Sequence, residues 1–170
     1  MSEEKKVLQD AERERQITEA EEYFKKYELN PILDKFFEIP EVEDVITKVY
    51  ERLEADIKQR VETFPLDVQE EVMRRKPKDF FVLKSVFTHM VKSTCKNMVS
   101  SVIMKSKSHN ISDKDIKANC LLLMDSRFNI DNLWIIETYA SSTANTMLET
   151  LDGMTSGDIV YPFTVCSEQN

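Results

Sequence analysis

Glycine is absent from the first 152 residues of this 170-residue chain, and its only two glycines are Gly153 and Gly157. A protein of this length carries about twelve glycines at an average usage of about 7%. Tight hairpin turns and phosphate-binding loops need a positive φ or a backbone without Cβ. The sequence therefore excludes glycine-rich nucleotide-binding loops and the G-x-S-x-G nucleophile elbow before Gly153. It predicts an all-α fold whose helices are joined by Pro, Asn, Asp and Ser.

The composition is typical of a globular protein from a reducing compartment. Hydrophobic residues make up 41% of the chain and charged residues 32%, so one domain is expected to bury about 70% of its unfolded surface. The three cysteines form no C-x-x-C pair, which argues against a disulfide framework. The longest purely apolar run, residues 120–124, is too short to cross a bilayer, and the acidic start does not resemble a signal peptide. We therefore expect a soluble intracellular protein with no membrane partner.

Hydrophobic periodicity and helix-end signals predict an irregular bundle of about six or seven helices, followed by a short extended C-terminal tail. Asn30 is the expected N-cap of a short helix that Pro40 ends, and Ser112 is the expected N-cap of a later one. Asn129 or Asp131 is expected to cap the last helix, which stops at Gly153. The helices are expected at residues 7–29, 30–39, 41–64, 66–75, 80–107, 115–124 and 131–153.

Three parts are expected along the chain. Residues 1–29 form a charged helical arm with few apolar side chains, in which residues 1–15 are mobile or bound to a partner. Residues 30–153 form the helical core domain. Residues 154–170 form the tail, where the stretch 157–164 (GDIVYPFT) has a high β-propensity.

Two amphipathic helices define the expected core. The helix at 41–64 has an apolar stripe at near-heptad spacing, formed by Val42, Ile46, Val49, Leu53, Ile57 and Val61. The helix at 80–107 has apolar residues three or four apart, which predicts a buried face formed by Leu83, Phe87, Met90, Thr94, Met98 and Val102. At 100° per residue, His89, Lys92, Lys96 and Lys107 lie on its opposite, polar face.

The charge of the chain changes sign along the sequence. Residues 1–60 hold 17 acids and 11 bases, residues 61–110 hold 5 and 9, and residues 111–170 hold 9 and 3. The overall charge of −8 disfavours non-specific attraction to nucleic acid or anionic lipid. The basic middle has two interpretations: it binds an acidic partner, or the acidic flanks neutralise it within the fold.

The candidate interface residues are basic or aromatic. The cluster Arg74, Arg75, Lys76 and Lys78 is either a nuclear-import or phosphate-contact patch, or a complement to the negative end of the preceding helix. Lys92 and Lys96 are candidates for contact with an acidic partner. The single tryptophan, Trp134, is either a core residue or an interface anchor. The eight methionines are either core gap-fillers or the lining of an adaptable groove.

No set of residues in the sequence matches a known catalytic, cofactor or metal site. His89 and His109 are far apart, and Cys95 is expected to project away from His89, so no Cys/His nucleophile pair forms. The cysteines and histidines lack the close pairing of zinc ligands. The stretch 125–131 has oxygen ligands at alternate positions, but Ile130 replaces the glycine that a calcium loop requires. We expect no enzyme activity, no cofactor and no small-molecule substrate.

A short helix at 66–75, a basic connection, a long helix at 80–107 and the sequence Ile111-Ser112-Asp113-Lys114-Asp115-Ile116 before a third helix resemble the histone fold. The likeness covers about 60 residues. It implies an obligate dimer, because a single histone fold leaves its long helix half exposed.

Two functions follow from the sequence. The leading hypothesis is a non-enzymatic helical protein–protein interaction module, a regulatory or structural subunit that binds a protein partner or itself. The alternative is a histone-fold-like subunit that contacts nucleic acid through the basic segment 74–107.

Overall fold

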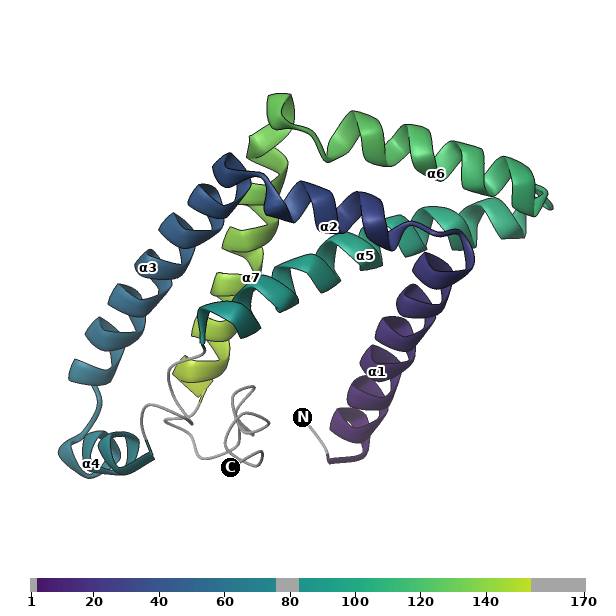
Figure 1. The fold of residues 1–170 in the computed structure, drawn as a ribbon. Coiled ribbons are helices and arrows are strands. Elements are labelled where there is room, and N and C mark those ends of the chain that lie inside the picture. The colour runs from purple at the N-terminus through teal and green to yellow at the C-terminus, as the bar shows by residue number, and fades with distance from the viewer. Residues whose placement is uncertain (1–2, 76–82, 154–170) are drawn as a thin grey trace. The chain divides into compact units, whose positions relative to one another are not determined.

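The chain is all-α in the part that its computed structural model describes, residues 3–75 and 83–153. Within those ranges the prediction of six or seven helices is confirmed, because seven α-helices and one short 3-10 helix are present and no strand occurs (Figure 1). The expected C-terminal tail and residues 76–82 lie outside the described ranges. The helices are α1 (Glu3–Lys26), α2 (Asn30–Glu38), α3 (Pro40–Glu62), α4 (Leu66–Arg75), α5 (Lys84–Ser108), α6 (Asp113–Arg127), the 3-10 helix η1 (Ile130–Asn132) and α7 (Leu133–Gly153).

Pro31 and Pro40 each lie in the first turn of a helix. Pro31 occupies the first turn of α2, where its missing N–H removes no helical hydrogen bond. Pro40 is the first residue of α3, and Ile39 before it has extended backbone angles, which a residue preceding proline favours. The prediction that Asn30 caps α2 is wrong. The helix begins at Asn30, and Leu29 holds the cap position without a side-chain hydrogen bond. The turn that separates α1 from α2 is made at Glu28, with φ 57°, so Asn30 already lies inside the second helix.

Two helix ends reach a positive φ without glycine. Glu28 follows α1 with φ 57°, and Asn110 follows α5 with φ 59°. In each case the next residue donates its N–H to a carbonyl five residues earlier, Leu29 to Phe24 and Ile111 to Ser106. This is the hydrogen bond of the Schellman ending, which commonly places glycine where Glu28 and Asn110 stand.

Of the predicted caps of the later helices, one is confirmed and one belongs to a different element. The hydroxyl of Ser112 accepts a hydrogen bond from the backbone N–H of Asp115 at 3.3 Å, which confirms Ser112 as the N-cap of α6. Asn129 caps η1 rather than α7, because its Oδ1 accepts from the N–H of Asp131 at 2.9 Å. The chain then continues from η1 directly into α7.

The described helices belong to two compact units. The first unit combines residues 1–42 with 92–135, and the second combines residues 43–91 with 136–170. Helix α5 contributes its first turns to the second unit and the rest of its length to the first.

The core of the first unit joins α2 to the end of α6. The ring of Phe36 lies 5.5 Å from the ring of Phe128, between ring centroids. Around this pair the unit buries Phe24, Leu29, Leu33, Cys95, Val99, Ile103, Ile116, Cys120 and Met124.

In the second unit the stripe predicted on α3 is buried from Ile46 to Ile57, and Val61 is half-buried. Tyr50 on the same helix stacks against Phe87 of α5, with 5.7 Å between the ring centroids. Helix α7 supplies Ile136, Ala140, Thr143 and Met147 to the core.

The predicted buried face of α5 is correct at Phe87 and wrong over most of the rest of the helix. Leu83 is exposed and Val102 is 39% exposed, while the buried positions recur every fourth residue, at Phe87, Val91, Cys95, Val99 and Ile103. Each step of four residues rotates the buried direction by about 40°. The buried side of α5 therefore moves around the helix, because its two ends pack in different units.

Candidate protein interaction surface

Lys92 and Lys96 form ion pairs within the fold. Lys92 Nζ lies 3.0 Å from Asp34 Oδ1 of α2, and Lys96 Nζ lies 3.0 Å from Glu21 Oε1 of α1. The side chain of Lys96 is only 11% exposed and its ammonium lies 5.6 Å from the centroid of the Phe24 ring. The expectation that Lys96 faces solvent is therefore wrong. The sequence left two interpretations of the basic middle segment: contact with an acidic partner, or neutralisation by its acidic flanks. Lys92 and Lys96 follow the second, because both pair with acids of residues 1–60.

The basic cluster at residues 74–78 is described only in part. Arg74 and Arg75 are the last two residues of α4, the position at which a cation complements the negative end of a helix. Their side chains lie outside the described part of the structure, as do Lys76 and Lys78. The two interpretations of this cluster stay open.

The two cysteines in the described ranges, Cys95 and Cys120, have buried thiols. Burial raises the pKa of the Cys95 thiol to about 12, and burial also raises the pKa of the Cys120 thiol. Since the thiolate is the nucleophile and the metal ligand, both sulfurs stay protonated and unreactive near neutral pH. His89 and His109 are exposed.

No group of three or more His, Cys, Asp or Glu side chains within the described residues is arranged to hold a metal ion. None of the helices in the same ranges combines the length and the apolar character needed to span a bilayer.

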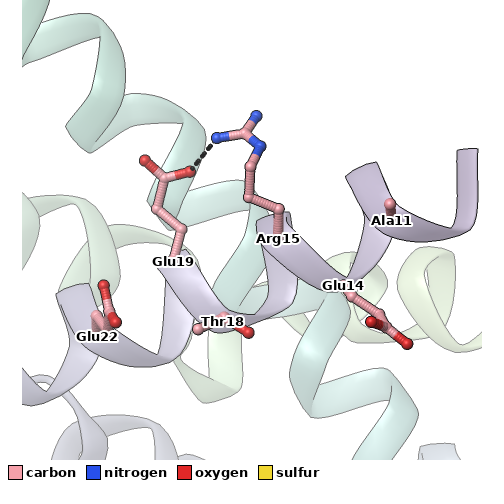
Figure 2. Close-up of a pocket in the computed structure, with 6 residues that line it drawn as sticks. All are labelled: Ala11, Glu14, Arg15, Thr18, Glu19 and Glu22. Atoms are coloured by element: carbon pink, nitrogen blue, oxygen red, sulfur yellow. Dashed lines mark hydrogen bonds and ion pairs between the residues drawn. The ribbon is translucent and has the colours of Figure 1, made fainter. Parts of the chain in front are cut away.

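The outer face of α1 is charged and open. Figure 2 shows six residues around a shallow hollow, and all of them come from this one helix. Arg15 donates a hydrogen bond to Glu19 at 3.1 Å, while Glu14 and Glu22 extend in other directions. Because these side chains diverge instead of converging, the face has no enclosed site for a small molecule.

A smaller hollow lies between α1 and α5 in the first unit. Its volume is about 120 Å³, and its lining includes Gln16 and Glu19 from α1 and Asn97, Ser100 and Ser101 from α5. A hollow of this size with polar side chains in its lining has room for water molecules. We therefore interpret it as a hydrated gap in the helix packing.

The third candidate is a group of exposed apolar side chains on the end of α6, η1 and the start of α7, which we call the Trp134 surface. Its members are Leu121, Leu122, Ile130 and Trp134, and Leu122, Ile130 and Trp134 are 71%, 50% and 63% exposed, respectively. These 14 residues of chain hold four of the eleven exposed large hydrophobic side chains of the described structure. All four belong to the first unit.

Helix geometry explains why Leu122 and Trp134 face outward. On α6 the buried residues Ile116, Cys120 and Met124 are four apart, and Leu122 lies about 200° around the helix from Cys120. On α7 Trp134 lies about 200° from the fully buried Ile136. Both residues thus point away from the face that packs in the core. The 63% exposure of Trp134 contradicts its interpretation as a core residue.

The turn that joins these elements is held by amide side chains. Asn132 Nδ2 donates to the carbonyl of Ser126 at 2.5 Å, and Asn129 Nδ2 donates to the carbonyl of Asp125 at 2.8 Å. These bonds satisfy carbonyls that the end of α6 leaves without helical partners. They fix η1, which carries Ile130, against the last turn of α6.

The charged residues closest in sequence to these side chains are mostly acidic. Asp125, Asp131 and Glu137 are exposed, and Arg127 is the base among them. Sequence reasoning had proposed Trp134 but not Leu122 or Ile130. A signal for Leu122 was present in the apolar run at 120–124. Three consecutive leucines point in three directions around a helix, so they cannot all face the side on which Ile116 is buried.

The chain matches no family model, no curated protein and no solved structure in comparisons with known proteins. Its function is therefore argued from its own residues. Among the three candidates, only the Trp134 surface combines large exposed apolar side chains with a rigidly held backbone.

Proposed function

We propose that this protein is a non-enzymatic helical interaction module, a regulatory or structural subunit that docks a protein partner on the Trp134 surface. The single observation that carries the proposal is the 63% exposure of Trp134, with Leu122 and Ile130 on the preceding elements also exposed. Tryptophan is among the residues that contribute most to binding energy at protein interfaces. Contiguous exposed apolar surface commonly marks an interaction site in a folded protein.

Complete burial of a large apolar side chain is worth about 1.5–3 kcal/mol relative to leaving it in water. Three such side chains on adjacent elements offer enough free energy to offset part of the entropy lost on association. The amide-fixed turn around Asn132 supports the proposal, because a surface that is already ordered loses less entropy when it binds.

The alternative of a nucleic-acid-binding subunit relied on the basic segment 74–107. Lys84, Lys92 and Lys96 of this segment pair with Glu43, Asp34 and Glu21, respectively. Paired lysines release fewer counterions on contact with phosphate, so they add less to nucleic-acid affinity. This observation favours the protein-binding function over the alternative.

The test compares complexes recovered from the cells of origin. Tagged wild-type protein is captured beside the double variant Leu122→Ala/Trp134→Ala and the control Leu66→Ala, which removes an equally exposed leucine from α4. The proposal expects at least one protein to be lost from the double variant and retained by the control, as measured by quantitative mass spectrometry. Equal capture by all three proteins would contradict the proposal. Melting curves confirm that each variant is folded.

A further inference from the structure

We infer that two copies of this chain exchange α1, so that α1 of one copy packs on α5 and α6 of the other. The seat of α1 in the first unit is then filled by the same helix from a second copy. Self-association of this kind does not depend on the Trp134 surface. Two features of the first unit support it: the way α1 is attached, and the turn between α1 and α2.

The packing of α1 is confined to its C-terminal half. The side chains from 11 to 18 are all exposed, and in the described part of α1 burial begins at Ala20. Phe24 and Tyr27 continue the buried side at the end of the helix. Because the free energy of apolar burial scales with the area removed from water, a helix buried over half its length is released at a lower cost than one buried throughout.

Ion pairs add to this attachment. Glu21 Oε1 lies 3.0 Å from Lys96 Nζ of α5. Lys26 Nζ lies 3.3 Å from Asp113 Oδ1 of α6. Each pair joins a residue before the turn at Glu28 to a residue after it. In an exchanged dimer, both pairs and the apolar contacts form again between two copies, so the exchange gives up none of them.

The turn that connects α1 to α2 is short and strained. Residues 27–29 separate the two helices, which diverge at this point (Figure 1), and Glu28 has a φ of 57°. The left-handed conformation is unfavourable for a residue with a Cβ. When the connection opens, Glu28 returns to an ordinary conformation and the strain is lost. A short connection under strain therefore favours exchange of the helix that it holds.

Pro31 makes an open connection accessible. It follows Asn30, and a residue before proline prefers an extended backbone to a helical one. The ring of Pro31 also prevents α1 and α2 from joining into one continuous helix. The open form therefore has an extended connection before α2, which lets α1 reach a second copy.

Crosslinking between isotopically different copies tests the exchange. Unlabelled and isotope-labelled full-length chains are mixed in urea, refolded together and treated with a carbodiimide, which joins an amine to a carboxylate in contact with it. Mass spectrometry then reads the crosslinked peptides. We expect Glu21–Lys96 peptides that combine a labelled and an unlabelled chain. The control pair Asp34–Lys92, 3.0 Å apart, lies entirely after the turn and should join residues of the same chain.

Variants at the turn test the part played by strain. Glu28→Gly should weaken dimerisation at least about tenfold in sedimentation, because glycine holds the closed turn without strain. The matched control Glu28→Gln also removes the ion pair with Lys117. It should dimerise like the wild type, because an exposed ion pair contributes little.

The opposite results overturn the inference. A wild type that stays monomeric, or a dimer whose Glu21–Lys96 peptides never combine the two labels, would show that α1 stays on its own chain. Equal dimerisation of the glycine and glutamine variants would also contradict it, because strain at Glu28 would then not favour exchange. The proposed function fails on a different result, in which the Leu122→Ala/Trp134→Ala protein keeps all of its cellular partners.

Discussion

The phenol of Tyr27 donates a hydrogen bond of 2.7 Å to Oδ1 of Asp113, 86 residues away in the sequence. It joins the end of α1 to the first residue of α6, and Lys26 adds an ion pair to the same oxygen at 3.3 Å. Tyr27 is buried while Asp113 is exposed. Within the first unit, the contact joins the C-terminal end of α1 to the N-terminal end of α6.

This contact predicts a loss of stability in alkali. Burial, followed by the hydrogen bond to Asp113, raises the pKa of Tyr27 from an ordinary value of 10 to about 12. The folded state therefore holds the phenol proton more tightly than the unfolded state. The contribution of Tyr27 is complete below pH 10 and is lost as the pH rises from 10 to about 12.

The measurement is urea unfolding of the wild type and Tyr27→Phe between pH 8 and pH 11. At pH 8 the variant should be less stable by about 1 kcal/mol, because it lacks the hydrogen bond. The difference should shrink above pH 10. A difference that stays constant across this range would show that Tyr27 titrates normally in the folded protein.

The corrected face of α5 predicts a contrast between neighbouring residues. Ile103 is fully buried, whereas Val102 is 39% exposed. Ile103→Ala should lower the free energy of unfolding by about 2–4 kcal/mol, because it removes buried methyl groups and leaves a cavity. Val102→Ala should cost less than about 1 kcal/mol. Denaturant unfolding of both variants checks the assignment, and a larger loss at Val102 would restore the face that the apolar spacing predicts.

The positive φ of Glu28 predicts that glycine stabilises this position. A left-handed conformation costs an ordinary residue about 1–2 kcal/mol, and glycine avoids this cost while adding unfolded-state entropy. Glu28→Gly should therefore raise the free energy of unfolding by about 0.5–1 kcal/mol. The control Glu28→Gln removes the ion pair with Lys117 but keeps the side chain. The helix ending at Glu28 would be contradicted if thermal melts showed the Glu28→Gly protein to be less stable than the Glu28→Gln protein.

The raised pKa of Cys95 predicts slow thiol labelling. In the native protein at pH 8, Cys95 should react with iodoacetamide only through unfolding, since its thiolate is scarce and its sulfur is buried. Peptide mapping by mass spectrometry should show Cys95 unmodified after native labelling and modified after labelling in urea. Rapid native labelling would place Cys95 at the surface.

The sequence predicts regular features of this fold well. The near-heptad stripe from Val42 to Ile57 is buried, and the Ser112 cap is present. The cap is a contact within one helix, and the regular stripe of α3 leaves that helix a single apolar face to bury. The helix at 66–75 also has the predicted bounds.

The features that sequence reasoning missed depend on tertiary packing. Lys96 is buried because Glu21 and Phe24 of α1 cover it, and no local pattern shows which helix lies over it. The buried side of α5 rotates because two units share that helix. Trp134 had two interpretations, with core packing favoured, and only the position of its neighbours in the fold shows that it is exposed.

A photo-crosslinking experiment tests the Trp134 surface most directly. A photoreactive amino acid is placed at residue 122 in the tagged protein, and at residue 66 in a control, and the cells of origin are irradiated. Both residues are leucines that are exposed in the isolated chain. The account predicts that residue 122 crosslinks to a protein that residue 66 does not reach, and that Trp134→Ala abolishes this product. The account is contradicted if residue 122 forms no specific product, or if the product persists unchanged without Trp134.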